Sequence, residues 1–85
     1  MRLHPQGLPI RVRCDEGGRP LAFTHAGQTY QVSGVEDVRE PHLDWWSPAG
    51  AAHRIYYLLT TQRGMICEIF EDRAGGGWFL ARVYD

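Results

Sequence analysis

Arginine and aromatic residues supply the side chains of this sequence that could bind a ligand. Successive residues of a strand point to opposite faces, so Arg54 and Tyr56 should share one face of their run. In the final run of the chain, the same alternation places Trp78 and Arg82 together. Curled β-sheets that bind single-stranded nucleic acid stack aromatic rings on bases and contact the backbone with arginine. We therefore expect single-stranded nucleic acid as one class of partner, although a small barrel also needs large aromatic residues to fill its core.

A second pair of arginines lies near the start of the chain. Arg11 and Arg13 alternate with the less polar residues Ile10, Val12 and Cys14, so both should project from the polar face of a strand. This pair is the clearest candidate for a small basic patch. With Trp46 added, the predicted nucleic-acid-binding residues are Arg11, Arg13, Arg54, Arg82, Trp46, Tyr56 and Trp78.

Trp45 and Trp46 form the most informative dipeptide of the chain. Adjacent residues of an extended segment point in opposite directions, so the two rings cannot easily enter one core. One ring should plug an open end of the barrel, and the other should stay on the surface as a stacking platform or an anchor for a protein partner. The alternative function is therefore a protein–protein interaction module or a homo-oligomerising domain, for example a homodimer. It would use Trp45 and Trp46 or a free sheet edge.

The chain lacks the sequence motifs of an enzyme or a metal site. Neither Ser33 nor Ser47 lies in a GxSxG turn, and Cys67 is followed by a carboxylate, which disfavours a reactive thiolate. The glycine run at 75–77 precedes a strand, so it lacks the helix N-terminus that holds a phosphate. The histidines and cysteines lack the short spacing of a structural zinc site. We expect no catalytic residue, no metal and no cofactor.

Short strands must position these side chains, because turns recur at short intervals along the chain. The 85 residues suffice for one domain with one modest core. Strand-like runs occupy residues 9–14, 21–24, 29–33, 35–38, 54–61, 65–71 and 78–84. Gly27 should form a tight hairpin and Gly34 a bulge or bend, whereas residues 40–52 predict a crossing loop that contains both adjacent Trp residues. The sequence predicts an all-β fold over residues 1–85, an antiparallel meander of about six strands curled into a small SH3-like barrel or roll.

The charge pattern limits the partners and the location. All nine basic residues are arginine, neither lysine nor asparagine occurs, and the formal net charge is −1. This usage is typical of a GC-rich, bacterial genome. A duplex-binding domain usually carries a basic excess, so any nucleic-acid site must be a local patch. No apolar run reaches the ~20 residues of a membrane span, and no signal peptide is recognisable. We expect a cytoplasmic protein with no membrane partner and with Cys14 and Cys67 reduced.

The carboxy-terminal part has a distinctive pattern of aromatic and strand-forming residues. The pattern consists of Trp45-Trp46, Arg54-Ile55-Tyr56-Tyr57, Thr60, Gly64 and Trp78-Phe79-Leu80-Ala81-Arg82-Val83-Tyr84-Asp85. On these residues the chain, over about 8–85, resembles a small bacterial domain family of unknown function and is similar to the C-terminal region of ImuB-like Y-family polymerase homologues. The resemblance implies an accessory role in DNA repair or damage tolerance, with single-stranded nucleic acid or a DNA-repair protein as partner. It carries over no catalytic residue, and a shared fold does not by itself mean a shared role.

Overall fold

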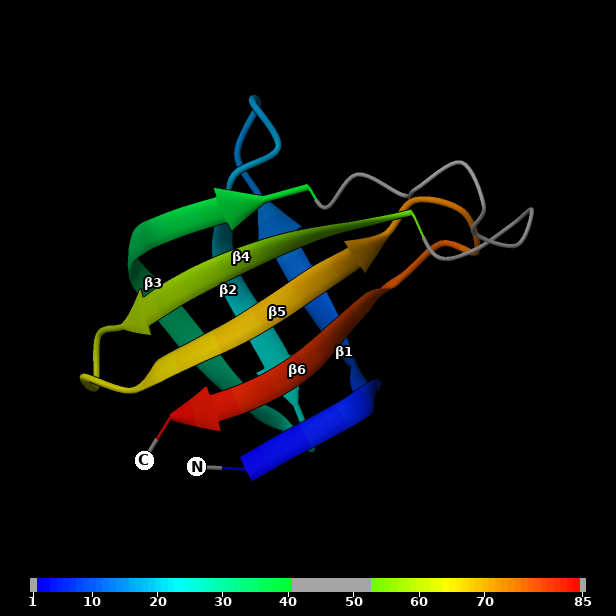
Figure 1. The fold of residues 1–85 in the computed structure, drawn as a ribbon. Coiled ribbons are helices and arrows are strands. Elements are labelled where there is room, and N and C mark those ends of the chain that lie inside the picture. Colours follow the sequence, from blue (N-terminus) through cyan, green and yellow to red (C-terminus); the bar gives the residue numbers. More distant parts are fainter. Residues whose placement is uncertain (1, 41–52, 85) are drawn as a thin grey trace.

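The described residues form a closed β-barrel. The computed structural model describes residues 2–40 and 53–84, with side chains from residue 7 onward. The strands are β1 (Arg2–Cys14), β2 (Pro20–His25), β3 (Gln28–Arg39), β4 (Arg54–Thr61), β5 (Ile66–Asp72) and β6 (Trp78–Tyr84). Each strand pairs antiparallel with the next, and β6 pairs with β1 to close the barrel. Figure 1 shows β4, β5 and β6 nearest the viewer, with β2 and the later part of β1 behind them and the start of β1 beside β6. The predicted all-β meander and its curling into a small barrel are confirmed.

Two predicted features of the chain path are confirmed. The turn Ala26-Gly27 joins β2 to β3, and its residues have φ values of 52° and 78°. Two successive positive φ values give a turn whose twist matches that of the flanking strands, which explains the glycine. Within β3, the register against β4 shifts between Val32 and Gly34. The two predicted runs on either side of Gly34 are therefore one strand that contains a bulge.

β1 is longer than the sequence indicates. The predicted strand starts at Pro9, whereas β1 starts at Arg2. The first part of β1 pairs with β6 and the last part with β2, so closure of the barrel supplies a partner for residues that alternation alone does not mark. The register with β6 shifts between Leu3 and Leu8, and Pro5 lies in this interruption. A proline, which has no backbone N–H, is tolerated at such a place.

Inward-facing residues fill the barrel, and a second buried layer lies outside it. The central core cluster consists of Ile10, Phe23, Leu59, Cys67, Ile69, Leu80 and Val83. Because alternation in β5 sends Cys67 and Ile69 inward, Glu68 and Phe70 point to the outer face. Both outward residues are nevertheless buried, with Glu68 5% exposed and Phe70 2% exposed. Side chains from neighbouring strands must cover them, and these side chains make the candidate site.

Candidate functional site

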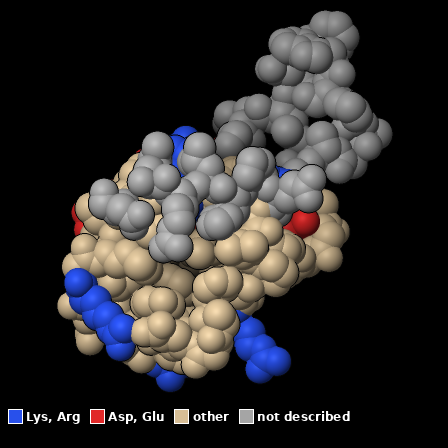
Figure 2. Space-filling view, turned by 90° about the horizontal axis from the view of Figure 1, so that it is seen from below, with Lys and Arg blue, Asp and Glu red and all other residues tan. Residues whose placement is uncertain are grey.

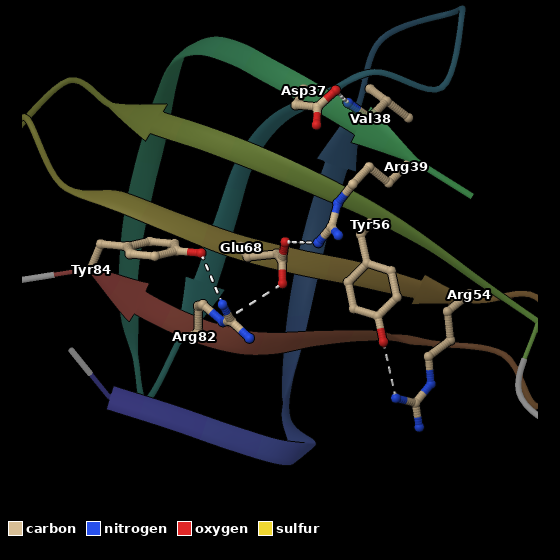
Figure 3. A network of polar contacts seen from close by, with 8 residues as sticks. All are labelled: Asp37, Val38, Arg39, Arg54, Tyr56, Glu68, Arg82 and Tyr84. Atoms are coloured by element: carbon tan, nitrogen blue, oxygen red, sulfur yellow. Dashed lines mark hydrogen bonds and ion pairs between the residues drawn. The ribbon is translucent and has the colours of Figure 1, made fainter. Parts of the chain in front are cut away.

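Seven side chains gather on the outer face of the wall that β3, β4, β5 and β6 form. We call this set the basic–aromatic face: Arg39, Arg54, Tyr56, Glu68, Phe70, Arg82 and Tyr84. Figure 3 shows the polar members of the set with their contacts. Strand register brings the set together, since Tyr56 lies opposite Arg39 on one side and opposite Phe70 on the other. In the next row, Glu68 lies opposite Arg82. Directly opposite residues have Cβ atoms about 4.5–5.5 Å apart, so their side chains touch.

Glu68 is a buried carboxylate held between two arginines. Nη2 of Arg39 donates to its Oε2 at 2.5 Å, and Nε of Arg82 lies 3.9 Å from its Oε1. The Glu68 side chain is 6% exposed, whereas those of Arg39 and Arg82 are 57% and 39% exposed. A buried charge needs such pairing, because desolvation of an unpaired carboxylate is costly. Each carboxylate oxygen therefore faces one guanidinium group, and both guanidinium groups remain partly open to solvent.

Two arginine–tyrosine pairs flank the carboxylate. Nη1 of Arg54 donates to the Tyr56 hydroxyl at 3.2 Å, and Nη1 of Arg82 donates to the Tyr84 hydroxyl at 3.2 Å. The bond to Tyr84 raises the pKa of the Arg82 guanidinium above its ordinary value, so this group is charged at every physiological pH. Each phenol accepts in these bonds, and its own O–H remains able to donate to a ligand.

Phe70 supports the face from below. Its ring stacks on Phe79 with centroids 5.1 Å apart, and the Cζ atom of Arg54 lies 4.4 Å above its centroid. A guanidinium over an aromatic face is attracted by the ring quadrupole, and burial strengthens the attraction. Phe70 is thus a platform that orients Arg54, and its 2% exposure leaves no ring surface for a ligand.

Four partly exposed members of the face follow one another along β5 in a fixed order. Opposite positions 72, 70, 68 and 66 of β5 lie, in turn, Arg54, Tyr56, Arg82 and Tyr84. The first two come from β4 and the last two from β6, so the series crosses β5 diagonally. Three steps of two residues at about 3.3 Å per residue give a length of ~20 Å. Arginine and tyrosine therefore alternate along this series.

Three of the predicted binding residues lie together on this face. Arg54 and Tyr56 share the outer side of β4, as predicted, and Arg82 lies two strands away on β6. The remaining predicted residues lie elsewhere in the barrel or outside the described residues.

Trp78 lies on the other side of β6. It packs against the core, with its ring centroid 5.4 Å from that of Tyr57. The prediction that Trp78 shares a face with Arg82 is wrong, because β6 contains a bulge. Leu80 and Arg82 pair with consecutive residues of β5, so Ala81 is an extra residue that reverses the alternation.

Arg11 and Arg13 lie on a different part of the barrel wall. Both are exposed beside β2, where Arg11 is opposite Thr24 and Arg13 is opposite Ala22. They line a hollow of about 310 Å³, with Thr29 on its far side. The predicted arginines therefore do not form one patch. Seen from below, the barrel surface shows arginine side chains that lie apart from one another, with acidic residues near its edges (Figure 2), in contrast to the cluster around Glu68.

Two other predicted contact regions are the loop with Trp45 and Trp46 and a free sheet edge. Trp45 and Trp46, with the predicted crossing loop beyond Glu40, lie outside the described residues, so their role stays a prediction. A free sheet edge finds no candidate across residues 2–40 and 53–84, where every strand has a partner on each side.

The cysteines are not activated as nucleophiles. Burial raises the pKa of Cys67 to about 12, so the thiol stays protonated at neutral pH. Desolvation also raises the pKa of Cys14, with Glu71 contributing further. Among the described side chains, no group of three His, Cys, Asp or Glu is placed to hold a metal ion. The described backbone also contains no helix long and apolar enough to cross a membrane.

Arg39, Glu68 and Tyr84 are the functional candidates that the sequence analysis did not include among the binding residues. A signal for Glu68 exists, because a carboxylate between two core residues, Cys67 and Ile69, must lie on the outer face of a strand. No comparable signal exists for Arg39. Its position opposite Tyr56 depends on two register shifts between β3 and β4, which alternation cannot locate.

Fold and site together define a small, closed antiparallel barrel with a basic–aromatic outer face. The chain belongs to a family described as a domain of unknown function, DUF6504, whose model matches residues 6–85. Comparison with curated proteins and with solved structures gives no match. The family match covers nearly the whole barrel and leaves its activity to be argued from the face itself.

Proposed function

We propose that this chain is a non-enzymatic bacterial binding module that contacts single-stranded nucleic acid through the basic–aromatic face. The observation that carries the proposal is the convergence of Arg39, Arg54 and Arg82, from three strands, beside Tyr56 and Tyr84. Guanidinium groups bind phosphate oxygens with paired donors, and aromatic rings stack on unpaired bases. The face therefore combines the two kinds of contact that a single strand requires.

The shape and charge of the face favour a single strand over a duplex. A base in a duplex is already stacked and cannot reach a tyrosine on a sheet surface, whereas an unpaired base can. Arginine and tyrosine alternate across β5 in the order Arg54, Tyr56, Arg82, Tyr84, which suits a chain whose phosphates and bases also alternate. The net charge of −1 disfavours the long-range attraction on which duplex binding usually depends.

An accessory role in DNA repair or damage tolerance is the cellular setting that we propose. It is supported by the resemblance to the C-terminal region of ImuB-like Y-family polymerase homologues, which extends over most of the barrel. Lesion bypass exposes single-stranded template, so a strand-binding accessory domain has a ligand there. This setting places the protein in the bacterial cytoplasm.

Charge reversal at Arg54 tests the proposal. Arg54→Glu removes one phosphate contact and adds repulsion, so we expect affinity for an oligodeoxythymidylate of about ten nucleotides to fall about tenfold or more. The matched control is Arg19→Glu, which makes the same charge change at an exposed turn residue away from the face. Fluorescence anisotropy of the labelled oligonucleotide measures both variants.

The same anisotropy titration, repeated at several salt concentrations, measures how the affinity depends on salt. Three arginines that neutralise two or three phosphates of a single strand predict a slope between about −1.4 and about −2 for log affinity against log salt concentration. Loss of one contact should reduce this slope by about 0.7. Equal weakening by Arg54→Glu and Arg19→Glu would show that only net charge matters, and would refute the assignment of this face.

A further inference from the structure

We infer that the buried carboxylate Glu68 positions Arg39 and Arg82 as the two arms of a site for one phosphodiester group. The inference rests on the proposed function and adds to it a defined subsite. It also gives Glu68 a role, although binding of a nucleic-acid strand does not by itself require a carboxylate. A carboxylate in the middle of a phosphate-binding face would otherwise repel the ligand.

Glu68 lies between the two arginines and restricts their directions. Glu68 lies on β5, whereas Arg39 and Arg82 come from β3 and β6, and each guanidinium faces a different oxygen of the same carboxylate (Figure 3). Without this contact, the Arg39 side chain, which is 57% exposed, would sample many rotamers. Fixing such a side chain in one conformation costs entropy. Because Glu68 fixes Arg39 before any ligand arrives, less of this cost falls on binding.

Arg39 and Arg82 keep guanidinium N–H donors that these contacts do not use. A guanidinium group has five N–H donors. Arg39 uses Nη2 toward Glu68, and Arg82 uses Nη1 toward Tyr84. Nε of Arg82 is buried and makes no hydrogen bond among the described residues. Both arginines are partly exposed, so their remaining N–H groups can reach a ligand that lies over the face.

The charge of the subsite selects the ligand class. Two guanidinium groups and one carboxylate leave a net charge of +1. This charge balances the single negative charge of a phosphodiester better than the larger charge of a terminal phosphate. The subsite therefore favours an internal linkage of a nucleic-acid strand over a free phosphate.

Glu68→Gln distinguishes positioning from simple charge. The substitution keeps the size of the side chain and makes the face more positive by one unit. If Glu68 only opposed the ligand, the variant would bind an oligodeoxythymidylate of about ten nucleotides more tightly. Because we assign it a positioning role, we expect binding about tenfold weaker, with a shallower salt slope, since Arg39 and Arg82 lose their fixed directions.

Glu71→Gln is the matched control. It makes the same chemical change on the same strand, three residues further along β5 and beside the core residue Trp78. We expect its affinity to stay within about twofold of wild type. Thermal melting of both variants shows whether they are folded. If Glu68→Gln unfolds, Glu68→Asp replaces it. This variant keeps the charge but draws the carboxylate back from Arg39 and Arg82, so it should lose about the same affinity, whereas a role of charge alone predicts no change.

A second probe separates this inference from the proposed function. Dimethyl phosphate, a phosphodiester with one negative charge, is titrated at constant ionic strength while the Nε–H resonance of Arg82 is followed by NMR. A saturable shift in wild type that is lost in Glu68→Gln supports the subsite, even if the oligonucleotide fails to bind and the proposed function falls. Tighter or unchanged oligonucleotide binding by folded Glu68→Gln overturns the inference while the proposed function stands. A wild-type protein that responds to neither probe overturns both.

Discussion

Gly7 is the position at which one added methyl group should damage the barrel most. Its φ of 79° is a left-handed conformation, which costs a residue with a side chain about 1–2 kcal/mol. A Cβ atom there would also lie 2.6 Å from the Cβ of Phe79 and 3.0 Å from the ring of Phe70. Neither neighbour can withdraw easily, because the first atom is fixed to the backbone of β6 and the Phe70 ring is buried beneath Arg54.

The expected loss for Gly7→Ala is the sum of these two effects. Overpacking of a filled site costs about 1–3 kcal/mol, so the total should be about 2–5 kcal/mol of unfolding free energy. In a domain of this size, each kcal/mol lowers Tm by about 4–8 °C. Urea unfolding monitored by circular dichroism gives the free energy, and a thermal melt gives Tm.

Gly64→Ala is the control that adds backbone strain without a steric clash. Gly64 has a similar φ of 83°, but an added Cβ would meet nothing within 4 Å. Its substitution should cost only the strain, about 1–2 kcal/mol. Equal losses for the two variants, or a loss below about 1 kcal/mol for Gly7→Ala, would refute the close packing of β1 over Phe70 and Phe79.

Three further outcomes follow from local geometry. Ala26→Asn should raise stability by about 0.5–1 kcal/mol in urea unfolding, because Ala26 has a φ of 52° in a turn that favours Asn-Gly; a loss of stability would show that the turn is built differently. The backbone N–H of Gly75 and that of Ala74 each donate a hydrogen bond to the Asp72 carboxylate. These bonds lower the pKa of Asp72 below its unfolded value of about 3.9. The stabilisation by Asp72 should therefore be complete above that pH and disappear as pH falls through the folded pKa. Asp72→Ala should accordingly be less stable than wild type at pH 7 and equally stable in strong acid; a difference that persists in acid would contradict this. Cys67, whose pKa burial raises to about 12, should react with a thiol reagent at pH 8 only after unfolding, and rapid native-state labelling would show that the core opens.

Much of the fold could be predicted from the sequence because most strands have one apolar face. Alternation marks β2, β4 and β5 within one or two residues, and Gly27 and Gly34 mark a hairpin and a bulge. The start of β1 escaped prediction, because its pairing with β6 arises only when the barrel closes. Long-range pairing of this kind leaves no period in the local sequence.

The candidate site could be predicted only in part. Arg54 and Tyr56 could be placed on one face because they are two residues apart on a strand without a bulge. Trp78 and Arg82 could not, since the bulge at Ala81 has no glycine or proline to announce it. Side chains that meet across strands depend on register, and register is set by the whole barrel.

Binding of single-stranded DNA at two salt concentrations shows whether the basic–aromatic face is a site for single-stranded nucleic acid. A labelled oligodeoxythymidylate and a duplex of equal length would be titrated with the protein at low and at physiological salt, with anisotropy as the readout. We expect saturable binding that prefers the single strand, weakens with salt with a slope between about −1.4 and about −2, and falls in Arg54→Glu. Absence of binding at low salt, or equal binding of the duplex, would contradict the assignment of the basic–aromatic face to single-stranded nucleic acid.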